Sequence, residues 1–129
     1  MLYDKVIFVV DDDISILRSI KRLLNASGFS AEVFDSAESF RDCAARDHGL
    51  CVVLDVNLSA TCGIELKRQL AASGSALPVI FVTANDSEHT RRTAIDAGCV
   101  AFLRKPFPAE SLFDAIHLAA NEPFHQLEH

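Results

Sequence analysis

Five polar side chains in this sequence lie one or two residues after the ends of apolar stretches and could act together on a phosphoryl group. The carboxylates are Asp11, Asp12 and Asp55, the hydroxyl is Thr83, and the ammonium group is Lys105. A carboxylate is a competent nucleophile that can form an aspartyl phosphate. An ammonium group and a hydroxyl can bind the oxygens of the phosphoryl group, where negative charge collects during transfer. These residue types therefore fit phosphoryl transfer, provided that the fold brings them together.

The carboxylates would repel one another if they were neighbours. Two unit charges about 4 Å apart repel by roughly 4 kcal/mol at an effective dielectric of about 20. Raised pKa values or a bound cation must offset this repulsion. Oxygen ligands favour Mg²⁺ or Ca²⁺ over softer-ligand metals, and the sequence has no calcium-loop pattern. The predicted cofactor is Mg²⁺ that keeps several of its water ligands.

The elements that must position these side chains form five strand–helix units. Apolar runs rich in β-branched and aromatic residues predict buried strands at residues 5–10, 31–34, 50–54, 78–82 and 100–103. The predicted helices begin at the caps Asp13 and Ser36, at Gly63, at Asp86 and at Pro108. Ser36 starts a helix that should include Phe40 and Ala44, and the last helix should reach Ala120. The predicted fold class is α/β: a five-stranded parallel sheet, doubly wound as (βα)5, with helices on both faces.

The carboxyl ends of parallel strands form one edge of such a sheet, and this edge is where ligands bind. The first strand leads into Asp11–Asp13, the third into Asp55, the fourth into Thr83 and the fifth into Lys105. An Asp triplet alone is often only a turn followed by a helix cap, and Asp13 is better explained as that cap. Joint placement at one edge, rather than any single residue, therefore carries the prediction.

Four separate motifs resemble the signature set of response-regulator receiver domains. They are the stretches 9–13 (VVDDD), 53–56 (VLDV), 81–84 (FVTA) and 102–107 (FLRKPF), and the resemblance extends from about residue 4 to residue 120. The stretches 36–40 (SAESF), 54–56 (LDV) and 63–66 (GIEL) resemble the FixJ-like branch. The resemblance implies the flavodoxin-like receiver fold. One departure is the absence of the proline-glycine turn that usually follows the acceptor in this family, because residues 57–63 here read NLSATCG.

The resemblance also implies a role for each site residue. Asp55 is the expected phosphate acceptor, and Thr83 and Lys105 bind phosphoryl oxygens. The expected Mg²⁺ ligands are Asp12, Asp55, the main-chain carbonyl of Asn57 and, through a bound water, Asp11. Thr83 and Phe102 are the expected switch residues, and the Lys105–Pro106 peptide bond is expected to be cis.

The implied function is a phosphorylation-operated switch rather than an enzyme acting on external substrates. The expected partner is a sensor histidine kinase or a phosphotransfer protein, and a homodimer through the fourth helix and fifth strand is the expected readout. Two alternatives stay open. A Mg²⁺-dependent aspartate-nucleophile phosphatase of the haloacid-dehalogenase type would need an acidic residue at the position of Asn57, and a phosphorylation-independent interaction module would not need the acidic site.

Composition limits the other functions. A formal net charge of -6 argues against direct nucleic-acid binding by this domain, and no apolar run reaches membrane-spanning length. We expect a cytoplasmic protein with four free cysteines, because their spacings are wide and none forms a C-x-x-C pair. The expected organisation is a receiver domain at residues 4–121, a C-terminal tail at 122–126, and a tag remnant at 127–129.

Overall fold

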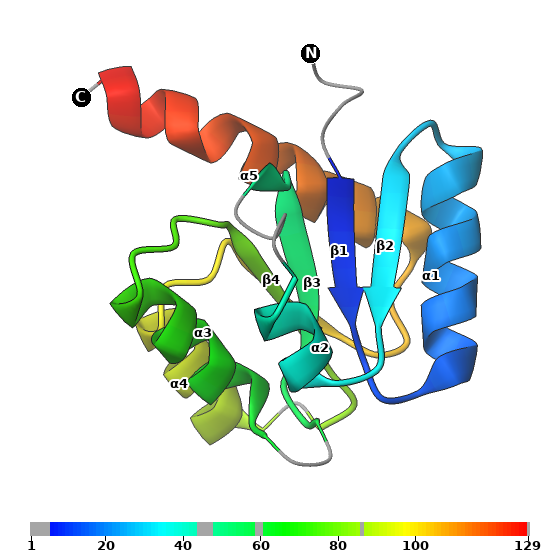
Figure 1. Cartoon of the computed structure of the whole chain (residues 1–129), viewed down its shortest axis with the longest axis horizontal. Coiled ribbons are helices and arrows are strands. Elements are labelled where there is room, and N and C mark those ends of the chain that lie inside the picture. The colour runs from blue at the N-terminus through cyan, green and yellow to red at the C-terminus, as the bar shows by residue number, and fades with distance from the viewer. Residues whose placement is uncertain (1–5, 44–47, 59–60, 86, 129) are drawn as a thin grey trace.

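The computed structural model describes residues 6–43, 48–58, 61–85 and 87–128 and has the predicted alternation of strands and helices (Figure 1). The elements are β1 (Val6–Val10), α1 (Ile14–Ala26), β2 (Ser30–Phe34), α2 (Ala37–Arg41), β3 (Cys51–Asp55), α3 (Gly63–Ala72), β4 (Val79–Thr83), α4 (Glu88–Asp96), β5 (Ala101–Arg104) and α5 (Ala109–Glu128). The strands pair in parallel in the order β2-β1-β3-β4-β5. This is the flavodoxin-like order, and it confirms the predicted fold class.

The sheet is covered on both faces because successive strand residues point in opposite directions. Ile7 and Val9 of β1 belong to a core cluster with residues of α1 and α5, whereas Phe8 and Val10 belong to a second cluster with residues of α2, α3 and α4. Figure 1 shows α5 behind the sheet and α2 in front of it. Both faces of the central strands are therefore apolar, and polar groups at these strands gather at the strand ends.

Two predicted helix caps are confirmed. Asp13 Oδ1 accepts a hydrogen bond from the main-chain N–H of Ser15 (2.9 Å), and Ser36 Oγ accepts one from Ser39 (3.2 Å). These bonds satisfy N–H groups that have no partner within the first turn of a helix. Gly28 follows α1 with a φ of 93°, which is the conformation expected of a glycine past a helix end.

The boundaries of the last two helices differ from the predictions. The cap of α4 is Ser87, whose Oγ accepts a hydrogen bond from Thr90 N–H (3.1 Å), so the helix proper begins at Glu88. α5 begins at Ala109, one residue after the predicted start at Pro108, and continues to Glu128. α2 ends at Arg41, so it is shorter than the predicted helix that was to include Ala44. Lys5, Ala44, Asp86 and His129 themselves lie outside the described residues. None of the helices in the described part of the chain is long and apolar enough to cross a membrane.

Candidate functional site

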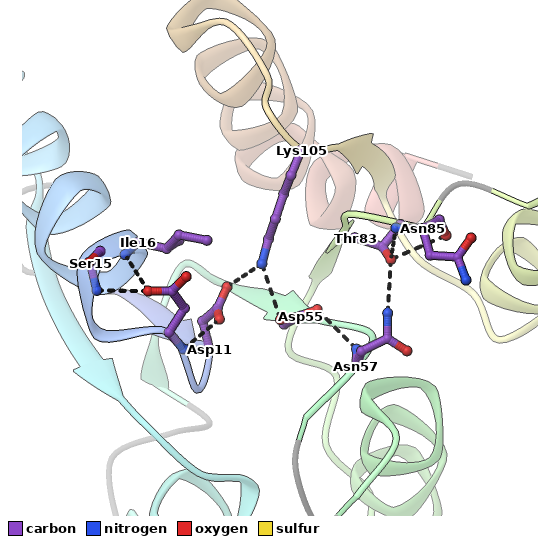
Figure 2. A network of polar contacts seen from close by, with 9 residues as sticks. Asp11, Ser15, Ile16, Asp55, Asn57, Thr83, Asn85 and Lys105 are labelled. Atoms are coloured by element: carbon purple, nitrogen blue, oxygen red, sulfur yellow. Dashed lines mark hydrogen bonds and ion pairs between the residues drawn. The ribbon is translucent and has the colours of Figure 1, made fainter.

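The polar residues predicted to form one site lie together at the carboxyl edge of the sheet (Figure 2). Asp11 follows β1, Asp55 ends β3, Thr83 ends β4, and Lys105 follows β5. The strand order reverses between β1 and β3, and such a switch point opens a crevice at the strand ends. The residues come from four different strands, so the sheet topology holds them in place.

Lys105 joins the two buried carboxylates. Its Nζ donates to Asp11 Oδ2 (2.6 Å) and to Asp55 Oδ2 (3.1 Å). The exposed fractions of the three side chains are 14% for Lys105, 2% for Asp11 and 7% for Asp55. Removing the lysine would leave two buried carboxylates without a compensating charge, which is strongly destabilising. The ammonium group therefore lies where it can hold both carboxylates and still face a group bound between them.

The charges alter proton binding at the site. Burial raises the pKa of the Asp55 carboxyl and the nearby Asp11 charge adds to the rise, while the Asn57 N–H and Lys105 only partly oppose it. Burial alone would lower the pKa of Lys105, but its hydrogen bonds and charge interactions with Asp11 and Asp55 outweigh burial and raise it. Lys105 therefore stays protonated at neutral pH, and ionised Asp55 would gain from a further cation.

The carboxylates also fit a metal ion. Asp11, Asp12 and Asp55 each offer an oxygen, and these oxygens lie within 4.8 Å of one another. Asp12 is exposed and the other two are buried, so a cation can enter the site from solvent on the side of Asp12. Hard oxygen ligands on a partly open site match Mg²⁺, which retains water ligands. The Asn57 carbonyl as a further ligand stays a prediction.

Thr83 forms a second polar network next to Asp55. Its side chain is fully buried, and its hydroxyl oxygen accepts hydrogen bonds from Asn57 Nδ2 (3.1 Å) and Asn85 N–H (3.0 Å). The hydroxyl is also within donating distance of the Asn85 carbonyl oxygen (3.3 Å). Asn57 reaches Asp55 as well, because its main-chain N–H donates to Asp55 Oδ1 (2.9 Å). The family resemblance implies only a carbonyl role for Asn57, and this use of its side chain is not apparent from the sequence.

Phe102 is half-buried in β5. It packs against the second core cluster, the one that contains residues of α2, α3 and α4. The guanidinium carbon of Arg91, on α4, lies 5.1 Å from the centre of the Phe102 ring, a cation–π contact. The contact ties the predicted switch aromatic to α4. Sequence reasoning could not find it, because it depends on how α4 is rotated against β5.

Gly63 is a further site residue whose importance the sequence did not reveal. It begins α3, and its N–H donates to the Val56 carbonyl oxygen (2.7 Å). A Cβ at this position would lie 2.2 Å from the Asp55 carbonyl oxygen, which is inside any allowed contact. Only glycine lets α3 start this close to the end of β3. The Lys105–Pro106 peptide bond on the other side of the site is cis.

The fold and this edge together define a receiver domain. Residues 7–117 match the family model described as the response regulator receiver domain, and the chain belongs to that family.

Similar proteins come from several bacteria. The response regulator protein TodT of Pseudomonas putida is 36% identical over 114 residues, which are 88% of this chain and 50% of that protein. The transcriptional regulatory protein TdiR of Thauera aromatica is 37% identical over 114 residues, again 88% of this chain and 50% of the relative. This chain thus spans about half the length of these curated relatives.

Solved structures agree with the fold. The response regulator StyR superposes with a TM-score of 0.84 at 36% identity, covering 96% of this chain and 63% of that one. FixJ-N superposes with a TM-score of 0.84 at 28% identity, covering 92% of this chain and 95% of that one. FixJ-N is thus among the structural neighbours, in line with the FixJ-like motifs.

Replacing Gly63 with alanine tests the close approach of α3 to Asp55. Helix propensity alone would favour Gly63→Ala by up to about 1 kcal/mol. Overpacking typically costs about 1–3 kcal/mol, and here the clash is with main chain that cannot rotate away. We therefore expect a net loss in the free energy of unfolding, measured in urea, and shifted amide resonances at residues 55–57.

Gly28→Ala is the control. Gly28 also has a special backbone conformation, but a Cβ there meets nothing within 4 Å. This variant should lose stability through its positive φ while leaving the amides of residues 55–57 in place. A Gly63→Ala protein as stable as wild type would show that the close approach is no constraint.

Proposed function

We propose that this receiver domain is a switch whose Asp55 accepts a phosphoryl group from a phosphohistidine of a sensor histidine kinase or phosphotransfer protein. In this step the P–N bond of the phosphohistidine breaks, and a P–O bond to an Asp55 carboxylate oxygen forms. The bonding pair stays with the imidazole nitrogen, which takes up a proton. The observation that carries the proposal is the position of the Asp55 carboxylate between Lys105 Nζ and the Asn57 N–H.

Each neighbouring group has a part in this reaction. Lys105 already lies 3.1 Å from Asp55 Oδ2 and can bind an oxygen of the incoming phosphoryl group. The Thr83 hydroxyl can turn toward a second phosphoryl oxygen. Asp11, Asp12, Asp55 and the Asn57 carbonyl would hold Mg²⁺, which supplies positive charge beside the phosphoryl oxygens.

The donor protein needs a surface beside the site. A groove of about 580 Å³ opens next to Lys105, between α1 and the connection from β5 to α5. Its apolar residues include Ile16, Ile20, Pro106 and Phe107. An apolar groove bordering the acceptor would let an apolar surface of the donor protein dock with its phosphohistidine facing Asp55. A cytoplasmic location is part of the proposal, and the free cysteines fit a reducing compartment.

The alternative functions are less well supported. A phosphatase of the haloacid-dehalogenase type would need a general acid where this chain has Asn57, and an amide cannot supply that proton. A module that ignores phosphorylation would gain nothing from burying two carboxylates, which is costly.

The proposed output runs from Thr83 to Phe102 and the surface of α4 and β5. Movement of Thr83 toward a phosphoryl group would vacate space into which Phe102 can turn. That turn would break the contact with Arg91 and change the α4–β5 surface, through which we propose that two copies associate.

Asp55 is expected to be the sole acceptor. Wild type treated with acetyl phosphate and Mg²⁺ should gain one phosphoryl mass in intact-protein mass spectrometry, and Asp55→Asn should gain none. Equal labelling of both proteins would show that another residue is the acceptor.

Loss of labelling in Asp55→Asn should not reflect unfolding. A carboxyl whose pKa is raised by folding favours the native state most below its ordinary pKa, and this contribution is lost as pH rises through the raised value. The neutral amide avoids that loss. At neutral pH without metal, the melting temperature of Asp55→Asn should therefore equal or exceed that of wild type.

Mg²⁺ should stabilise the fold before any phosphorylation. A ligand that binds only the native state raises stability by RT ln(1 + [L]/Kd), about 2.7 kcal/mol at a hundred times Kd. The melting temperature of wild type should rise with Mg²⁺ in a thermal scan, and Asp12→Ala should abolish the rise. Asp114→Ala removes the same charge from an exposed position on α5 and should keep it. A wild-type melting point indifferent to Mg²⁺ would contradict the metal site.

Activation should increase the mass of the protein in solution. Light scattering with beryllofluoride and Mg²⁺ should show a dimer in wild type and a weaker response in Phe102→Ala. Leu118→Ala, an equally apolar truncation at an exposed position on α5, should respond as wild type does. If beryllofluoride leaves the wild-type mass unchanged, self-association is not the output. If Phe102→Ala responds as wild type does, the signal does not pass from Thr83 to the α4–β5 surface through Phe102.

A further inference from the structure

Asn57 is the one described residue whose hydrogen bonds reach both Asp55 and Thr83. Its main-chain N–H donates to Asp55 Oδ1 (2.9 Å), and its side-chain Nδ2 donates to Thr83 Oγ1 (3.1 Å). Thr83 is 26 residues further along the chain, so only the pairing of β3 with β4 brings the two together. Figure 2 shows the Asn57 amide pointing at the Thr83 hydroxyl, beside Asp55.

These bonds use the full capacity of the Thr83 hydroxyl. A hydroxyl has one hydrogen to donate and two lone pairs that accept. The lone pairs face Asn57 Nδ2 and the Asn85 N–H, and the hydrogen can point only at the Asn85 carbonyl among the partners described. Thr83 is fully buried, so water cannot readily replace a lost partner. The hydroxyl is thus held in an arrangement that does not use its hydrogen on Asp55.

A phosphoryl group on Asp55 would offer the Asn57 amide a new hydrogen-bond acceptor. Its oxygens are charged acceptors, and hydrogen bonds to charged acceptors are stronger than those to a neutral hydroxyl. Asn57 is two residues after Asp55, and its Nδ2 would gain by donating to a phosphoryl oxygen instead of to Thr83. Thr83 would then lose one restraint at the moment when its own hydrogen has a better acceptor.

We propose that the Asn57 side chain is a positioning residue that holds Thr83 in its resting conformation and releases it when Asp55 is phosphorylated. The inference rests on the proposed function and adds a restraint to its switch. Asn57 is exposed, and Thr83 keeps its bonds to Asn85 without it, so the side chain is not needed for folding. A typical hydrogen bond makes a net contribution that corresponds to about a two- to tenfold change in an equilibrium constant. Loss of the amide should favour the active conformation by that factor.

The test compares unphosphorylated Asn57→Ala with wild type by NMR. Amide resonances of residues 88–104 are recorded for wild type without ligand and with beryllofluoride and Mg²⁺, which gives the resting and active positions. Without ligand, the resonances of Asn57→Ala should lie displaced from the resting position along the line toward the active one. Asn57→Leu keeps the volume and removes both amide donors, so it should move them in the same direction.

A Thr83→Val background provides the matched control. The valine has no hydroxyl for Asn57 to hold, so adding Asn57→Ala should move the resonances no further. Wild type that fails to respond to beryllofluoride contradicts the proposed function itself. Wild type that responds, while both Asn57 variants remain at the resting position without ligand, overturns the restraint alone. An equal displacement by Asn57→Ala in the Thr83→Val background also overturns it, because the effect would not pass through the hydroxyl.

Discussion

The contact of Lys105 with Asp11 and Asp55 is the interaction on which the rest of the site depends. Two carboxylates buried at the ends of neighbouring strands would repel strongly, and the ammonium group between them makes their burial possible. One positive charge leaves an excess of negative charge even against these two carboxylates, and Asp12 adds to it. The site is therefore neither neutral nor closed, and its excess of negative charge favours the binding of a cation.

Because both faces of the sheet are apolar, the charged groups are confined to one edge of it. Strands β1, β3 and β4 have almost no exposed surface along their length, so polar groups there can reach solvent only at the strand ends. The order β2-β1-β3-β4-β5 then places the ends that carry Asp11 and Asp55 side by side at the switch point. Gly63 adds the opposite constraint, since α3 can approach the Asp55 carbonyl only without a side chain at that position.

The sequence was sufficient for features that depend on pattern. The strand and helix alternation, the caps Asp13 and Ser36, and the meeting of Asp11 with Asp55 and Lys105 all follow from local periodicity and from the rule that parallel strands share a carboxyl edge. It was insufficient where contacts depend on the rotation or spacing of packed elements. The Arg91–Phe102 contact, the Asn57 amide on Thr83 and the steric role of Gly63 are all of this kind.

Two of the contacts that sequence reasoning missed share a further property: each restrains a group that would have to move in the proposed switch. The Asn57 amide restrains Thr83 near the acceptor, and the Arg91 guanidinium covers Phe102 at the other end of the route. Neither contact is strong, because a neutral hydrogen bond and an exposed cation–π contact are each worth only about 1 kcal/mol. Weak restraints suit a switch, since a phosphoryl group can reverse an equilibrium only if its differential affinity for the two states exceeds what holds the resting one. In the proposed switch, buried charge would thus supply the chemistry, while contacts of modest strength would set how readily that chemistry is converted into a change of surface.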